Sequence, residues 1–197
     1  MTRLALMPLA AALLLAGCAQ TYVSPVSVTR FVGQQPALLG HGPIAVRAAS
    51  GTPTDSLEFA PYWQAVSGEL ARLGYQVVPG NEAAQVAEVR VARFVNQPGH
   101  GHNPVSVGVG GATGSYGSGV GMGVGIDLSG PPPAVTDTQM GVTIRDSASG
   151  QPLWEGRADF AASANTAYGN AQAAAAKMAG ALFAGFPGRS GETVQVR

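Results

Sequence analysis

The histidines are the side chains of this chain best suited to hold a metal ion. His100 and His102 are separated by a single glycine, and His41 is the only other histidine. Neutral imidazole is a good ligand for zinc, copper and nickel, but a catalytic zinc ion is usually held by three protein ligands. No neighbouring His or Cys supplies a third ligand. His100 and His102 are therefore weak metal candidates, and we expect a polar loop there and no cofactor.

The sequence lacks the short motifs that mark the common enzyme classes. A dinucleotide site would need Gly-x-Gly-x-x-Gly, but Gly108 and Gly110 are followed by Thr113 at the position of the third glycine. The only lysine, Lys177, does not follow a glycine-rich loop, so a phosphate-binding loop is absent as well. Acidic residues such as Glu88 alternate with apolar ones, which is typical of the solvent-facing side of a strand. We expect a protein that is not an enzyme, because a hydrolase needs an acid, base and nucleophile set that the sequence does not display.

Aromatic side chains offer a second kind of site. Tyr62, Trp63 and Trp154 are expected first as core residues, because large aromatic rings dominate core packing. A groove between a helix and a sheet lined by these three residues would be a common type of small-molecule site. A binding module for a lipid, glycan or peptide in such a groove is therefore the alternative function.

Composition narrows the function classes further. The chain has 197 residues, which corresponds to one domain or two. Eleven Lys and Arg balance eleven Asp and Glu, and only 11% of residues are charged, against about 25% in ordinary soluble domains. A nucleic-acid-binding domain would carry a basic face. This balance argues against nucleic acid as a partner.

The N-terminus has the pattern of a secretory signal peptide. Arg3 precedes an uncharged, mostly apolar run over 4–16, which is too short to span a bilayer as a helix. The junction Leu15-Ala16-Gly17-Cys18 resembles the lipobox of bacterial lipoproteins. The resemblance implies that residues 1–17 are removed and that Cys18 is lipidated. Prolines and glycines interrupt the segment that follows, so we expect 18–42 to form a lipidated tether. Ala19, as a residue other than Asp after the cysteine, implies sorting to the outer membrane.

Hydrophobic periodicity predicts the elements behind this tether. Alternation predicts strands, and helical spacing predicts helices. The expected strands cover 43–49, 75–78, 86–95, 140–144 and 154–160, with a weaker alternation over 26–31, and the expected helices cover 57–73 and 167–186. This order predicts an α+β fold, a two-layer sandwich of a mainly antiparallel sheet with both helices on one face. The single domain would cover 43–190, followed by a C-terminal tail over 191–197.

The first of these helices has a clear apolar stripe. Trp63, Val66, Leu70 and Leu73 recur at helical spacing, and we expect them to pack on the strand over 86–95. Gly68 interrupts this helix, and glycine is unfavourable inside helices, so we expect a close contact beside it.

A glycine-rich segment covers 99–130, where twelve of 32 residues are Gly. Val105, Val107 and Val109, and later Val120 to Ile126, repeat at every second residue, which is strand spacing. We expect a β-hairpin insertion with one apolar face and one face almost without side chains. An ordinary extension of the domain, a partner or self-association surface, and a membrane-inserted segment remain open as its role.

Several short segments resemble one family of bacterial envelope lipoproteins. They are Ser56-Leu57-Glu58-Phe59, Leu73-Gly74-Tyr75, the strand over 87–94, Trp154-Glu155-Gly156, and Leu182 to Pro187. Together with the lipobox they are similar to the lipoproteins grouped as domain of unknown function 4136. The resemblance implies an envelope lipoprotein of α/β type and supplies no catalytic residues. We therefore expect a non-catalytic outer-membrane lipoprotein, with its domain in the periplasm and a structural or assembly role. An envelope protein or a second copy could bind through 99–130.

Overall fold

The computed structural model describes residues 21–52, 57–80, 83–97, 105–114, 117–126 and 132–197. The chain divides into two units, which are described separately. The larger unit comprises residues 21–97 and 134–197, and the smaller unit comprises residues 1–20 and 98–133.

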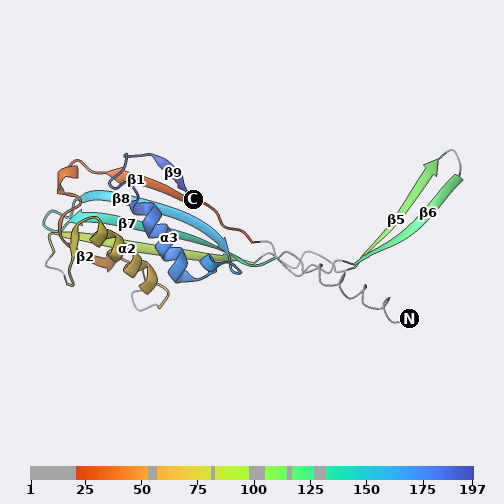
Figure 1. Cartoon of the computed structure of the whole chain (residues 1–197), viewed down its shortest axis with the longest axis horizontal. Helices are drawn as coiled ribbons and strands as arrows, with labels where there is room; N and C mark the ends of the chain where they lie inside the picture. Colours follow the sequence, from red (N-terminus) through yellow and green to blue (C-terminus); the bar gives the residue numbers. More distant parts are fainter. Residues whose placement is uncertain (1–20, 53–56, 81–82, 98–104, 115–116, 127–131) are drawn as a thin grey trace, which may run out of the picture. The chain divides into compact units, whose positions relative to one another are not determined.

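Seven strands form the sheet of the larger unit, in the order β3-β2-β4-β7-β8-β1-β9 (Figure 1). Their bounds are β1 Val26–Val32, β2 Gly42–Ala48, β3 Tyr75–Val77, β4 Gln85–Asn96, β7 Val135–Asp146, β8 Pro152–Ser163 and β9 Thr193–Val196. The strands predicted from alternation over 86–95, 140–144 and 154–160 are confirmed as the cores of β4, β7 and β8.

The sheet is mixed, which corrects the expectation of a mainly antiparallel one. Strands β4, β7, β8, β1 and β9 pair with antiparallel neighbours, whereas β2 runs parallel to both β3 and β4. The reason lies in the connection from β2 to β3. This connection contains a helix that carries the chain back along the sheet, so the second strand starts at the same end as the first.

Two helices, α2 Ala60–Arg72 and α3 Ala171–Phe183, cover one face of the sheet and contact each other (Figure 1). Two short 3-10 turns, η1 Pro36–Leu38 and η2 Ala167–Gly169, precede β2 and α3. The α+β class with two helices against a sheet is confirmed. Both helices are shorter than predicted, and the first turn expected in the second one is η2.

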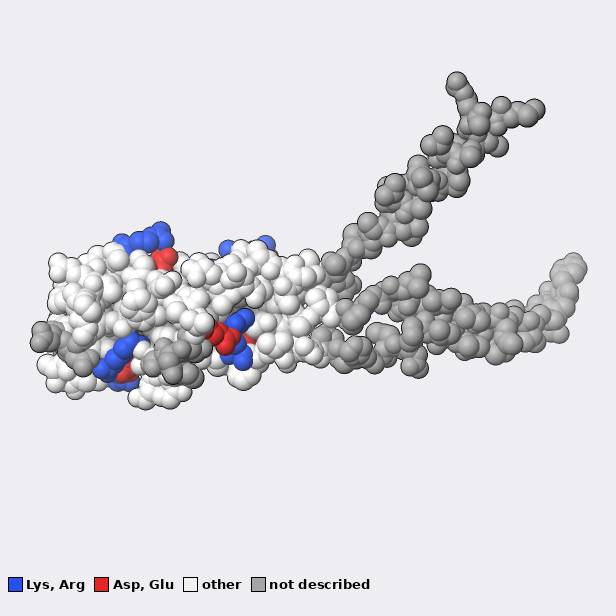
Figure 2. All heavy atoms as spheres, turned by 90° about the horizontal axis from the view of Figure 1, so that it is seen from below, with Lys and Arg blue, Asp and Glu red and all other residues white. Residues whose placement is uncertain are grey.

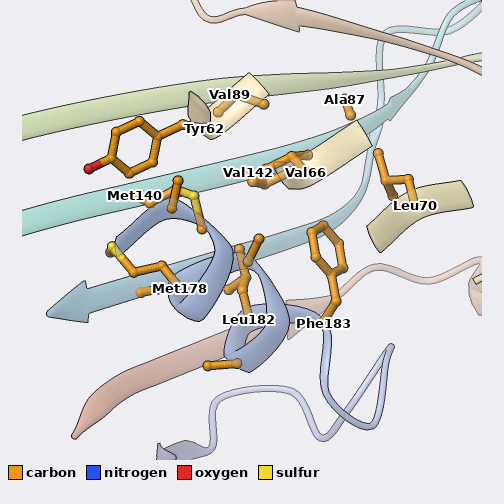
Figure 3. Close-up of a cluster of buried hydrophobic side chains, with 14 of the residues drawn as sticks. Tyr62, Val66, Leu70, Ala87, Val89, Met140, Val142, Met178, Leu182 and Phe183 are labelled. Atoms are coloured by element: carbon orange, nitrogen blue, oxygen red, sulfur yellow. The ribbon is translucent and has the colours of Figure 1, made fainter. Parts of the chain in front are cut away.

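The buried stripe of α2 differs from the predicted one. Tyr62, Val66 and Leu70 are fully buried and lie over β4 and β7, as Figure 3 shows. Trp63 is 40% exposed, and its indole nitrogen donates a hydrogen bond to the Val46 carbonyl at 3.1 Å. Tyr62 and Trp63 are adjacent aromatic residues, so the sequence is compatible with either phase of the helix. Contact with the sheet decides that Tyr62 is the buried one.

Gly68 lies on the exposed side of α2. A Cβ added to Gly68 would meet no atom within 4 Å. The predicted close contact beside this glycine is therefore wrong, because the residue faces away from the sheet.

The sheet extends beyond both predicted limits of the domain. β1 lies within the predicted tether over 18–42, and β9 lies within the predicted tail over 191–197. Val26 and Val28 are fully buried, because β1 pairs with β8 on one side and β9 on the other and lies beneath α3. Described contacts begin still earlier, where the Tyr22 amide donates to Ser163 Oγ at 3.0 Å. The predicted tether is thus part of the domain from residue 21 onward.

Arg30 is a buried charged residue in β1, with 8% of its surface exposed. Its Nε donates to the Leu182 carbonyl at 2.8 Å and its Nη2 donates to the Ala181 carbonyl at 2.9 Å. These carbonyls belong to the last turn of α3, where backbone acceptors lack partners within the helix. Burial lowers the pKa of Arg30, and the charge of Glu192 opposes this effect. The positive charge also complements the helix dipole at this end.

The described part of the smaller unit is a pair of antiparallel strands, β5 Val105–Gly114 and β6 Gly117–Ile126. Val105 pairs with Ile126, and Gly114 pairs with Gly117. The connecting residues 115–116 lie outside the described residues, so the predicted hairpin stays a prediction. Among the described residues, no helix combines the length and hydropathy needed to cross a membrane.

Candidate functional site

The structure does not gather Tyr62, Trp63 and Trp154 around a groove. Tyr62 and Trp154 are 0% and 1% exposed, and both belong to the core. Trp154 donates from its indole nitrogen to the Pro187 carbonyl at 2.9 Å and stacks on Phe183 with ring centroids 5.4 Å apart. Burial raises the pKa of the Tyr62 hydroxyl. Trp63 lies at the surface, so these three residues do not form the predicted helix–sheet site. Their first expected role, in the core, holds for Tyr62 and Trp154.

The remaining predicted site residues cannot be placed in the fold. Cys18, His100 and His102 lie outside the described residues, so lipidation and metal binding stay predictions. Within the part of the chain that the structure describes, no three His, Cys, Asp or Glu side chains come together as a metal site.

A groove of about 730 Å³ lies on the face of the sheet opposite the helices. Strand register explains its polar floor. Gln139 pairs with Asp159, Asp159 pairs with Ser27, and Ser27 pairs with Gln195. Directly paired residues on neighbouring strands project to the same face, so these four polar residues form one continuous row across β7, β8, β1 and β9.

Beside this polar row, the groove is lined by aromatic rings. Phe94 pairs with Asp137, and Tyr22 lines the same end of the groove. The two rings are 55% and 53% exposed, respectively. Asn96 donates from its amide nitrogen to the Asp137 carboxylate and so holds that carboxylate in place. The groove thus combines two exposed rings with amide, hydroxyl and carboxylate groups.

This arrangement is suited to binding. Carboxylates accept hydrogen bonds, amides donate and accept them, and aromatic rings supply apolar contact area. A ligand with hydroxyl or amide groups and one apolar face fits these partners.

A smaller hollow of about 430 Å³ adjoins this groove and shares Gln139 and Asp159 with it. Gly141 forms its floor and pairs with Arg90 on one side and Arg157 on the other. Arg157 donates to the Glu155 carboxylate at 2.9 and 2.7 Å, so part of its charge is already balanced. An acidic group on a bound ligand would meet these two guanidinium groups.

The sequence analysis missed this groove, although one signal was present. Alternation along 154–160 already places Asp159 on the solvent-facing side of its strand. The rest of the groove could not be inferred, because Asp159 pairs with Gln139 and Ser27 from other strands. Phe94 and Asp137, which also line the groove, come from strands joined across the insertion at 98–133. Only the pairing of β4 with β7 brings them together.

No protein-family model matches the sequence, and no curated protein is significantly similar to it. Among solved structures, a PDZ domain protein from Parabacteroides distasonis is 14% identical, with a TM-score of 0.48 over 89% of this chain; the chain spans 38% of that protein. The PelC dodecamer from Paraburkholderia phytofirmans is 12% identical, with a TM-score of 0.47 over 83% of this chain and 99% of that one. A variant of the same protein is 13% identical, with a TM-score of 0.45 over 82% of this chain and 98% of that one. These distant likenesses carry no functional argument.

Proposed function

We propose that the chain is a bacterial outer-membrane lipoprotein, similar to those grouped as domain of unknown function 4136, with a non-catalytic domain in the periplasm. The observation that carries the proposal is the junction Leu15-Ala16-Gly17-Cys18 behind an uncharged apolar run. Acyl chains on Cys18 would provide the membrane attachment, at about 0.8 kcal/mol for each buried methylene. In this proposal the domain acts as a structural or assembly component of the envelope.

Expression of the full chain in a Gram-negative host tests this proposal. The wild-type protein is expected to lose residues 1–17, to incorporate labelled palmitate and to fractionate with the outer membrane. Cys18→Ser is expected to stay unprocessed and free of acyl chains. Serine replaces the sulfur with oxygen and keeps a side chain of nearly the same size. Mature size and membrane retention of Cys18→Ser would overturn the proposal.

The finer parts of the fold belong to the same proposal. We propose that residues 115–116 join β5 and β6 into a hairpin, and that the insertion over 99–130 offers a surface to an envelope partner or to a second copy. The pairing of Gly114 with Gly117 supports a short connection. Deleting 99–130 and measuring the oligomeric state by light scattering tests the second part. A monomer both before and after the deletion would remove self-association.

The groove supports a second candidate function, a binding module for a glycan. The polar row from Gln139 to Gln195 and the exposed rings of Tyr22 and Phe94 match a ligand with many hydroxyl groups and apolar ring faces. The test is an NMR titration with chitotetraose as a neutral probe. Wild type is expected to show saturable shifts at groove residues, and Phe94→Ala to lose them. Phe31→Ala, a change to an exposed ring outside the lining of the groove, is the matched control. Equal binding by both variants would exclude the groove.

A further inference from the structure

Large apolar side chains lie exposed at one end of the sheet, where β4 ends at Asn96 and β7 begins at Val135. Three successive residue rows form this end, and strand register places them across β4, β7, β8 and the segment before β1. The rows contain Phe94, Asp137, Ala161 and Ser24; Val95, Thr136, Ala162 and Val23; and Asn96, Val135, Ser163 and Tyr22. Chain segments that are far apart in sequence therefore lie at the same end of the sheet, with the middle row on one face and the two outer rows on the other.

Large apolar side chains on this end remain exposed to solvent. Tyr22 is 53% exposed, Val23 is 42%, Phe94 is 55% and Val95 is 61%. These four make up half of the large apolar residues that are exposed within 21–52, 57–80, 83–97 and 132–197. We call Tyr22, Val23, Phe94 and Val95 the apolar end. Successive residues of a strand point to opposite faces, so Tyr22 and Phe94 lie on the face with the groove, and Val23 and Val95 lie on the face with the helices. All four lie at the same end of the strands, and exposed apolar side chains gathered in one region mark contact with a protein or a membrane more often than isolated residues do.

Charged residues are scarce at the apolar end. Asp137 is the only one in the three rows, and its carboxylate accepts a hydrogen bond from Asn96. Elsewhere on the domain, arginines pair with glutamates, as Arg47 does with Glu88. On the face shown in Figure 2, the visible described surface toward the right-hand end of the domain is white, without Lys, Arg, Asp or Glu. Such a surface can approach a lipid bilayer with little desolvation of charge.

The position of Cys18 identifies the occupant of this surface. Thr21, the first described residue, is three positions after Cys18 and directly precedes Tyr22. Three residues of fully extended chain span at most about 11 Å. A tether over 18–42 would have allowed the domain to move far from its anchor. The actual start of the domain at residue 21 removes that freedom.

We infer that the apolar end rests on the bilayer surface beside the lipid anchor, with Tyr22 and Phe94 at the level of the lipid headgroups. This inference rests on the proposed lipidation of Cys18. Aromatic rings favour the membrane interface, where one end of the ring is apolar and the other is hydrated. The acyl chains hold the surface at the membrane, and the apolar end then fixes the orientation of the domain.

Site-specific labelling of the full, acylated chain tests the orientation. Because lipidation consumes the only native thiol, one introduced cysteine gives one labelling site. Val95→Cys and Phe94→Cys place an environment-sensitive nitrobenzoxadiazole probe at the apolar end. Leu38→Cys is the matched control, since Leu38 is also apolar and exposed. Its carbonyl accepts a hydrogen bond from Gln85, the first residue of β4, roughly 33 Å along that strand from Val95.

Each labelled protein is placed in vesicles of phosphatidylethanolamine and phosphatidylglycerol. Quenching by nitroxide-labelled lipid and by aqueous iodide is then measured. The probes at 94 and 95 are expected to show several-fold stronger lipid quenching than the probe at 38, and weaker iodide quenching. Equal lipid quenching at all three positions overturns the inference. Shielding of 94 and 95 from both quenchers also overturns it, because residues 98–133 or a second copy would then cover the apolar end.

Mass spectrometry of the same preparation separates the two proposals. A cysteine without acyl chains overturns the lipoprotein proposal, and the orientation falls with it. An acylated protein whose probes at 94 and 95 do not meet lipid overturns the orientation alone.

Discussion

Adding one methyl group to Gly156 should destabilise the domain, because the space beside this glycine is already filled. Gly156 lies in β8 and faces α3. A Cβ on it would overlap the six-membered ring of Trp154 and would lie 2.8 Å from Leu182 Cδ1. Both neighbours are fully buried. The Trp154 ring is also held by its hydrogen bond to Pro187 and by stacking on Phe183, so it cannot retreat without losing these contacts.

The expected size follows from two opposing terms. Overpacking a well-filled core costs about 1–3 kcal/mol, and rigid neighbours place Gly156→Ala toward the upper part of that range. Replacing glycine lowers the entropy of the unfolded chain and returns about 0.4–1 kcal/mol. We therefore expect a net loss of about 2 kcal/mol in the free energy of unfolding. For a domain of this size that loss lowers Tm by roughly 4–8 °C.

Gly141→Ala is the matched control, because Gly141 lies in the neighbouring strand β7 and faces the opposite side of the sheet. A Cβ there would meet only the guanidinium of Arg90, at 3.6 Å, which can move. Its stability should be unchanged or higher by up to about 1 kcal/mol. Urea unfolding followed by tryptophan fluorescence and near-ultraviolet circular dichroism measures both variants. Equal losses in the two variants would refute the packing argument, and so would wild-type stability of Gly156→Ala.

Three further predictions concern stability, and each is checked by unfolding curves. Gly68→Ala should raise the free energy of unfolding by about 1 kcal/mol, because the position is helical, exposed and unobstructed; a decrease would show that the glycine is required. Arg30→Met should lower it by about 2–4 kcal/mol, since two carbonyls at the end of α3 lose a charged donor; Arg30→Lys should recover only part of this loss, and full recovery would contradict the two-bond arrangement. The pKa of Glu88 lies below its ordinary value, chiefly because Arg47 donates a hydrogen bond to its carboxylate. Burial raises this pKa by a smaller amount, and a hydrogen bond from Arg145 lowers it further. The stabilisation from Glu88 should therefore be complete above about pH 4.3, its unfolded pKa, and disappear as pH falls through the lower folded pKa. Glu88→Gln should flatten this acid dependence, and an unchanged pH profile would exclude the linkage.

Local patterns predicted an element well where one of its faces is apolar and the other is polar. The alternation along 86–95 and 154–160 is a property of adjacent residues, so it is readable without knowing the partner strands. The same holds for α3, whose small and apolar residues recur at helical spacing. In α2 the pattern was ambiguous by one residue. Tyr62 and Trp63 have similar apolar character, and only contact with β4 and β7 decides that Tyr62 is buried.

Segments with weak local patterns were predicted only in part, for a related reason. The weak alternation over 26–31 does form β1, but the domain was predicted to begin at 43 and to end at 190. β1 and β9 pair through residues such as Val26 and Val196, which are far apart in the chain. Proline and glycine around 33–43 suggested a tether. β9 has only four residues, which is too short for alternation to stand out in the sequence. β8 pairs with β1 and α3 lies over it, and β9 in turn pairs with β1. That stabilisation is absent from any short stretch of sequence.

The α+β class could be inferred from residue order, because the alternation of strands and the spacing of helices depend on neighbours along the chain. The lipobox-like junction at Cys18 is local in the same way, and the lipidation that it predicts stays a prediction. Residue order also showed which side of each strand is polar. The groove and the apolar end arose only when strands distant in sequence were paired. Register places Phe94 beside Asp137, and Asp159 beside Ser27. Hydrogen bonding between strands sets such neighbours, and the energy of that pairing depends on the whole sheet.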